Sequence, residues 1–97
     1  MTLMELRDEL RRFAAERDWE RFHSPKNLAM ALSAEAAELV EHFQWRSQPR
    51  PEALDEIGQE MADVLIYLVR LADRLDVDLL AATERKMDIN AGRFPAA

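Results

Sequence analysis

The sequence has 97 residues, of which 48% are hydrophobic and 33% charged, with two glycines and no cysteine. This composition predicts one globular domain spanning residues 1–97, and it excludes disulfides and thiolate chemistry. The net charge of −6 disfavours binding to a nucleic-acid polymer. Met1 to Phe13 lacks the apolar segment of a signal peptide, and the longest apolar run, Val64 to Val69, is too short to cross a membrane. We therefore expect a cytoplasmic protein without a membrane partner.

The first half of the chain predicts two helices. Residues 3–17 carry apolar side chains at helical spacing, with Thr2 as N-cap and Glu5 completing a capping box. After an irregular stretch, Ser24 followed by Pro25 is typical of a helix start, and this helix is expected to run to about Trp45. The prolines of the following segment, residues 46–51, indicate a short loop, so the helices on either side should be antiparallel neighbours.

The second half predicts two more helices, over about residues 52–75 and 79–91, with Gly92 ending the last one. The third has a long apolar stripe, and Val64 to Val69 is apolar nearly all round. A helix segment of this kind is covered on two sides, by a neighbouring helix and by another subunit. The expected fold is all-α, a four-helix antiparallel bundle-like domain that assembles as a homodimer or a dimer of dimers.

One stretch of the second helix places acids where apolar residues are expected. Leu28, Leu32 and Leu39 recur on one helix face, and Glu35 falls between them on that face. Glu38 lies one turn further on, at the edge of the stripe. A carboxylate that faces a core is costly unless something pairs with it, and a cation is the usual partner for several acids together.

The third helix repeats this arrangement with Glu60 and Asp63. Each pair is spaced by three residues, which puts the two side chains about 5 to 6 Å apart on one surface. Two antiparallel helices can face their pairs, and four converging carboxylates would repel one another unless a divalent ion such as Mg²⁺ or Mn²⁺ neutralised them. The plainer alternative is that these acids are solvated, or paired with Arg46 or Arg70.

Together with the two acidic pairs, several collinear segments carry a family resemblance: Phe13 to Trp19, Phe22 to Leu28, Phe43 to Trp45, Asp63 to Val69 and Lys86 to Asn90. The chain resembles the all-α nucleoside triphosphate pyrophosphohydrolases of the MazG-like superfamily, and within it the dCTP pyrophosphatase branch. The resemblance implies Mg²⁺-dependent hydrolysis of dCTP, or a modified dCTP, to the monophosphate and pyrophosphate. It also implies roles for particular residues: metal ligation by Glu35, Glu38, Glu60 and Asp63, a base pocket with Trp19 and Trp45, and substrate contacts by Tyr67, Lys86 and Asn90.

The chain departs from that family pattern at two positions. Ala34 stands where many members have an additional glutamate, and Leu10 stands where the closest branch has a histidine. Glu38 or Glu41 is a candidate to accept the proton of the attacking water. His42 is expected near the acids, and His23 in the loop before the second helix; a di-iron site is disfavoured because His42 lacks a glutamate three residues earlier. The alternative function is a noncatalytic helical dimer that binds a nucleotide or divalent metal.

Overall fold

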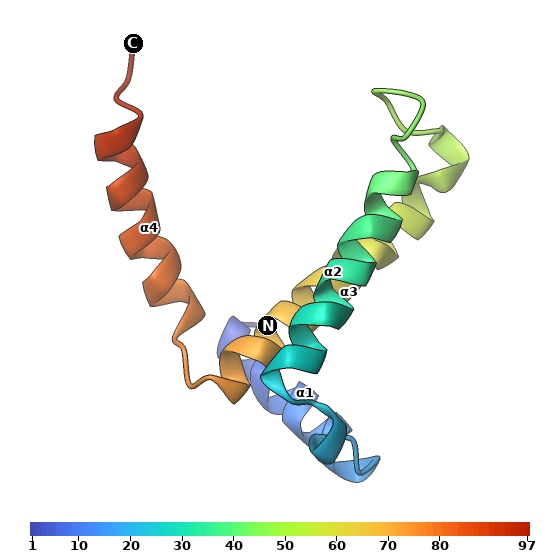
Figure 1. Ribbon diagram of the computed structural model, residues 1–97, viewed down its shortest axis with the longest axis vertical. Helices are drawn as coiled ribbons and strands as arrows, with labels where there is room; N and C mark the ends of the chain where they lie inside the picture. The colour runs from blue at the N-terminus through green and yellow to red at the C-terminus, as the bar shows by residue number, and fades with distance from the viewer.

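The structure is a computed structural model that describes residues 1–97, and it is entirely helical. The chain forms four α-helices and two short 3₁₀ turns, and Figure 1 labels the α-helices. In chain order they are α1 (Leu3–Glu16), η1 (Glu20–Phe22), α2 (Pro25–Glu41), η2 (Pro51–Ala53), α3 (Leu54–Arg74) and α4 (Leu79–Arg93). The all-α prediction with four helices is confirmed.

Three predicted helix boundaries were wrong. The second helix ends at Glu41 rather than near Trp45, because the N–H groups of His42 and Phe43 bond to carbonyls only three residues back, which tightens the chain into a turn. Glu52 belongs to η2, so α3 begins at Leu54. α4 continues through Gly92 to Arg93, because no glycine of the chain adopts the positive φ that would form a helix C-cap.

α2 and α3 form the main packing unit of the chain. They run antiparallel and side by side, as the short connection predicts, and α1 packs against α3 (Figure 1). The apolar core is small: its buried residues are Ala14, Leu28, Ile57, Val69 and Ala72. Leu28 is the most deeply buried of the large side chains, at 1% exposed, and it anchors the same α2 face that carries Glu35.

Much of the apolar stripe predicted for the third helix remains uncovered in the single chain. Ile57 and Ala72 are buried as expected, whereas the exposed members of the stripe are Leu54, Met61, Leu65 and Leu75. Part of the cover on the second side of α3 comes from α1, whose Leu3 and Met4 lie near Val69. The segment Val64 to Val69 was expected to be covered by a neighbouring helix on one side and by another subunit on the other. On that second side, part of the cover comes from α1 of the same chain.

α4 stands apart from the other helices. It leaves the end of α3 through Leu75 to Asp78, where Asp76 adopts a positive φ of 55°, and then points away from the α2–α3 pair (Figure 1). The four helices therefore do not close into a bundle within one chain. None of the helices combines the length and apolar composition that crossing a membrane requires.

The start of α2 is fixed by a side-chain cap, and this cap can be tested. Ser24 Oγ accepts a hydrogen bond from the N–H of Asn27 at 3.1 Å, and Pro25 occupies the first helical position. Ser24→Ala should lower the free energy of unfolding by about 1 kcal/mol, because it removes the acceptor for an otherwise unpaired N–H. The control is Ser33→Ala, which changes an exposed serine in the middle of the same helix and should cost nothing. Urea denaturation followed by circular dichroism measures both, and equal effects would contradict a capping role.

Candidate active site

The pairing of α2 with α3 brings the four predicted carboxylates together. Glu35 is half-buried on α2, and it lies within electrostatic reach of Glu38 and of Glu60 and Asp63 on α3. Burial raises the pKa of the Glu35 carboxyl above its usual range, and the negative charges of Glu38, Asp63 and Glu60 raise it further. The two acidic pairs thus influence one another electrostatically, whereas the ligand atoms that lie within 4.8 Å of one another belong to His42, Glu56 and Glu60, so the four-carboxylate metal site stays a prediction.

No lysine or arginine neutralises this group. Glu35, Glu38 and Asp63 have no ion-pair partner, and Glu60 has only the neighbouring His42. Arg70, one of the two cations considered as partners from the sequence, instead contacts Glu20 of η1 and Asp73 near the end of α3. Arg46 forms no ion pair. Pairing of the acids with these arginines is therefore wrong, while Glu38 is exposed, as the alternative of solvated acids expects. Carboxylate oxygens are donors that suit a divalent cation.

His42 and Glu56 extend the acidic group toward the end of α2. His42 Nε2 lies 2.7 Å from Glu60 Oε2, and the two side chains are only 17% and 14% exposed. Glu56, one turn before Glu60 on α3, completes a set of three whose ligand atoms all lie within 4.8 Å of one another. The expectation that His42 lies near the acids is confirmed. Glu56 was missed, although its spacing of four residues from Glu60 puts both on one helix face.

A cavity of about 370 Å³ opens beside this set, at the loop between α2 and α3. His42 and Glu56 line it, together with Glu41 and Trp45, and so do two arginines, Arg46 and Arg50. Guanidinium groups bind phosphate oxygens well, so the cavity has both the acids needed for a metal ion and cations suited to an anionic ligand. These two arginines were not predicted as site residues: Arg46 was considered only as a partner of the acids, and Arg50, between Pro49 and Pro51, carried no signal of a ligand.

The two predicted base-pocket tryptophans lie at opposite ends of α2. Trp45 is in the loop after α2 and is 89% exposed, which is unusual for so large an apolar side chain. Trp19 precedes η1 and packs edge-on against Phe13, with ring centroids 5.5 Å apart. A helix of this length spans roughly 25 Å at 1.5 Å per residue. The two rings of one chain are therefore too far apart to sandwich a single base.

The remaining predicted substrate contacts lie on two different helices, only one of which carries acids of the candidate site. Tyr67 is half-buried on α3, one turn beyond Asp63, on the helix that carries the acids. Lys86 and Asn90 lie one turn apart on α4, with Lys86 exposed. Because α4 points away from α2 and α3, these two residues do not join the four carboxylates of their own chain (Figure 1).

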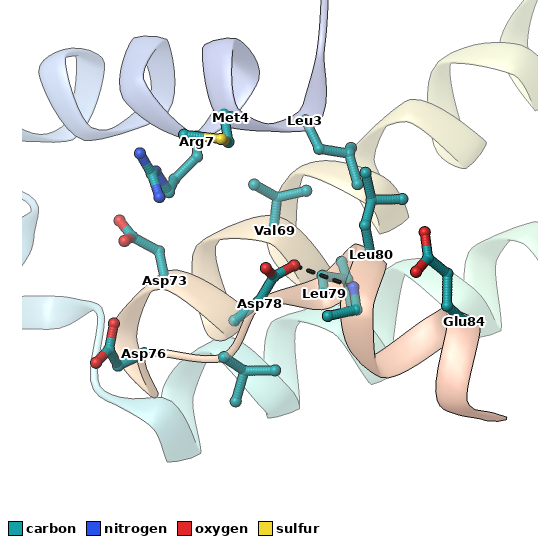
Figure 2. Close-up of a pocket in the computed structure, with 13 residues that line it drawn as sticks. Leu3, Met4, Arg7, Val69, Asp73, Asp76, Asp78, Leu79, Leu80 and Glu84 are labelled. Carbon is teal, nitrogen blue, oxygen red and sulfur yellow. Dashed lines mark hydrogen bonds between the residues drawn. The ribbon is translucent and has the colours of Figure 1, made fainter.

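The larger cavity of the molecule is in another place. It has a volume of about 470 Å³ and lies between the start of α1, the end of α3 and the start of α4. Figure 2 shows Leu3 and Met4 of α1, Val69 of α3 and Leu80 of α4 around it, with several acidic side chains at its edge. None of the predicted site residues lines it, so size alone does not identify the functional cavity here.

The raised pKa of Glu35 predicts how acidity acts on the metal-free protein. Between its ordinary value of 4.5 and the raised value, the folded state binds more protons than the unfolded state, so stability falls as pH rises through that window. Without divalent metal, Glu35→Gln should therefore be more stable than the parent chain at pH 7, and the gain should vanish near pH 4.5. Urea denaturation in EDTA across this pH range measures the difference.

The control for this pH dependence is Glu9→Gln, which changes an exposed glutamate of α1 that forms no ion pair. It should shift stability equally at both pH values. A constant difference between the parent chain and Glu35→Gln would contradict the view that Glu35 lies among uncompensated charges.

Comparison with known proteins gives a consistent result. A sequence model of the MazG-like family matches residues 30–96, which include the four carboxylates. The chain is 49% identical over 102 residues to dCTP pyrophosphatase 1 of Homo sapiens and 50% identical over 101 residues to that of Rattus norvegicus. These matches cover 98% and 97% of this chain, but 60% and 59% of the two relatives. The chain therefore spans about 60% of the length of these relatives.

A solved structure is similar over nearly its full length. The crystal structure of a pyrophosphatase from Archaeoglobus fulgidus superimposes with a TM-score of 0.83 and is 41% identical in sequence. The match covers 96% of this chain and 92% of that one. With this fold, these two helix-borne acidic pairs and a family match over more than half of its residues, the chain belongs to the MazG-like family.

Proposed function

We propose that residues 1–97 form a single domain that hydrolyses a nucleoside triphosphate, with dCTP or a modified dCTP preferred, to the monophosphate and pyrophosphate in the cytoplasm. The observation that carries the proposal is the group of four carboxylates without a lysine or arginine partner, in which Glu35 has a raised pKa. Relatives that match nearly the whole chain are named dCTP pyrophosphatase, and a structure that superimposes on it is named a pyrophosphatase.

The proposed cofactor is Mg²⁺, with Mn²⁺ as a possible substitute, held by Glu35, Glu38, Glu60 and Asp63. These hard oxygen donors suit either ion, and the buried Glu60 Oε2 has no hydrogen-bond partner, as expected for an oxygen that a cation would occupy. When bound, the ion would neutralise phosphate charge and lower the pKa of the attacking water.

The remaining steps belong to the side chains of the protein. Glu38 is exposed at the edge of the group and can accept the proton of the attacking water, with Glu41 in the adjoining cavity as the second candidate. Trp45, which lines that cavity and is otherwise exposed, can stack on the base. Tyr67 lies on the α3 face next to Asp63 and can contact the sugar. Trp19, Lys86 and Asn90 complete the proposed substrate contacts.

We further propose that the active enzyme is a homodimer or homotetramer in which α4 of one chain contributes to the site of another. Three observations support this: Lys86 and Asn90 stand apart from the acids of their own chain, the two tryptophans lie at opposite ends of α2, and apolar side chains are uncovered on several helices. The exposed ones include Met61 and Leu65 on α3, and Leu80, Met87 and Ile89 on α4.

The activity is tested by incubating the purified chain with Mg²⁺ and each of the common dNTPs, and measuring pyrophosphate. We expect pyrophosphate to be released faster from dCTP than from the other dNTPs. Equal release from all would contradict the cytosine preference, and none from any nucleotide would favour the alternative, a noncatalytic helical dimer that binds a nucleotide or metal.

The shared site is tested by mixing two inactive variants. Asp63→Asn removes a proposed metal ligand, and Lys86→Ala removes a proposed substrate contact on α4. If sites are shared between chains, a mixture of the two variants should regain activity, because some sites then combine an intact acidic group with an intact α4. Absence of any regain, with exchange of chains shown by mass spectrometry, would indicate that each site is built from one chain.

A further inference from the structure

We propose that His42, Glu56 and Glu60 form an additional metal position beside the four-carboxylate group, and that it takes a transition-metal divalent cation such as Mn²⁺ in preference to Mg²⁺. The position shares Glu60 with the proposed active site and so deepens the proposed function. Two of its three side chains, His42 and Glu56, lie outside the four acids.

The spacing of the three side chains fits one ion. Two ligands at right angles, each with a bond of about 2.1 Å, lie roughly 3.0 Å apart, and two ligands on opposite sides lie roughly 4.2 Å apart. His42 Nε2 and Glu60 Oε2 are separated by 2.7 Å, and all three ligand atoms lie within 4.8 Å of one another. Glu56 is exposed, so its side chain can move the remaining few tenths of an ångström.

The contact between His42 and Glu60 is not a satisfied hydrogen bond. Although the two atoms are close, Glu60 Oε2 is buried and has no hydrogen-bond partner. A buried carboxylate oxygen without a partner is costly, and the cost is removed when a cation binds it. An ion bound here would take both this oxygen and the ring nitrogen 2.7 Å away as ligands.

The nitrogen ligand decides which ion is preferred. Mg²⁺ takes oxygen ligands and keeps several waters, whereas imidazole suits Fe, Ni, Cu and Zn. Mn²⁺ is the weakest binder of the first-row series at sites with nitrogen ligands, but as a transition metal it accepts an imidazole alongside carboxylates. The four-carboxylate group offers only oxygen. A chain with both sets therefore has one position suited to Mg²⁺ and one suited to a transition metal, and Glu60 can serve both because a carboxylate has two oxygens.

The surroundings supply a role for this ion. His42 and Glu56 line the cavity of about 370 Å³ whose wall also holds Arg46 and Arg50, and neither arginine forms an ion pair within the chain. A phosphate group bound to the metal would meet these two guanidinium groups. The position would therefore hold part of the triphosphate chain at the end of the acidic group nearest to Trp45.

The test uses the full chain, freed of metal with EDTA and titrated with MnCl₂ in excess MgCl₂, with bound Mn²⁺ measured by electron paramagnetic resonance. One Mn²⁺ per chain should resist displacement by Mg²⁺, and its pulsed spectrum should show coupling to an imidazole nitrogen. In His42→Leu and in the polar variant His42→Gln, the coupling should disappear and affinity for Mn²⁺ should fall at least about tenfold. Loss of a residue that only hydrogen-bonds to a metal ligand already lowers metal affinity by about that factor.

Two carboxylate variants serve as a matched pair. Glu56→Gln should weaken Mn²⁺ binding while nitrogen coupling remains, whereas Glu52→Gln, which lines the same cavity outside the set, should bind as the parent chain does. The proposal is overturned if the parent chain shows no nitrogen coupling, or if both His42 variants bind Mn²⁺ unchanged.

The same measurement separates this position from the proposed activity. Asp63→Asn should lose pyrophosphate release and keep the nitrogen-coupled Mn²⁺. Mn²⁺ at His42 in a chain that hydrolyses no nucleotide would refute the proposed function alone, and pyrophosphate release without nitrogen-coupled Mn²⁺ would refute this inference alone.

Discussion

Asp63→Asn should reduce the rate of pyrophosphate release by at least about 10³-fold. In other enzymes, removing one group that stabilises transition-state charge lowers kcat by about 10²- to 10³-fold. The substitution keeps the size and polarity of the side chain and removes its negative charge. It also removes one of the charges that raise the pKa of Glu35. The folded chain should therefore be at least as stable as the parent without metal, while Mg²⁺ should no longer stabilise it to the same extent.

Asp55→Asn is the matched control, since Asp55 is an exposed aspartate in the first turn of the same helix. It should leave turnover within about twofold, with a stability change below about 1 kcal/mol from the helix dipole. Initial rates of pyrophosphate release and thermal melting with and without MgCl₂ measure both variants. Retained turnover in Asp63→Asn would remove the four-carboxylate site from the mechanism.

Arg70→Met should lower the free energy of unfolding by about 3 kcal/mol, the lower end of the range for breaking a buried ion pair. Arg70 is 3% exposed and connects η1 with α3: Nη2 lies 3.4 Å from Glu20 Oε1, and Nε donates to His23 Nδ1 at 3.4 Å. Nη1 lies 3.4 Å from Asp73 Oδ2. The lower end applies because these contacts are long and because Asp73 also accepts a hydrogen bond from Arg11 Nε at 2.8 Å.

Arg74→Met tests whether burial is the cause. Arg74 pairs with the same glutamate, Glu20, at 3.1 Å, but its side chain is 38% exposed. Arg74→Met should therefore lower the free energy of unfolding by less than about 1 kcal/mol. A second readout is His23, whose pKa is lowered by burial and by the charge of Arg70. Nuclear magnetic resonance should find that pKa closer to its ordinary value in Arg70→Met. Equal losses of stability in the two variants would contradict a special role for the buried arginine.

The fold could be predicted from the sequence where local signals act alone. The caps at Thr2 and Ser24 each bond to the N–H three residues later, and the corresponding helices begin where those residues predict. The helix ends were less predictable. Nothing in the apolar pattern of Leu39 to Trp45 distinguishes a helix from a turn, and Gly92 permits a C-cap without requiring one. The direction of α4 depends on the backbone at Asp76, which no sequence pattern specifies.

The candidate site was predictable to the extent that it lies on one pair of helices. The spacing of Glu35 and Glu38 and of Glu60 and Asp63 fixes their helix faces, and the short connection fixes that α2 and α3 are antiparallel. Glu56 was missed because an exposed acid in the first turns of a helix is ordinary. The buried contacts of Arg70 were missed because they join residues that are 47 and 50 positions apart along the chain.

The separation of α4 from the rest of the chain has a consequence for how the protein would behave on dilution. The carboxylates on α2 and α3 belong to one chain, whereas in the proposed assembly Lys86 and Asn90 reach a site only when chains associate. Dilution would thus remove the α4 contacts first and leave the acids in place. Specific activity would then fall with protein concentration while the capacity to bind a divalent ion persisted, so that an isolated chain would be a metal-binding protein and only an assembled one an enzyme.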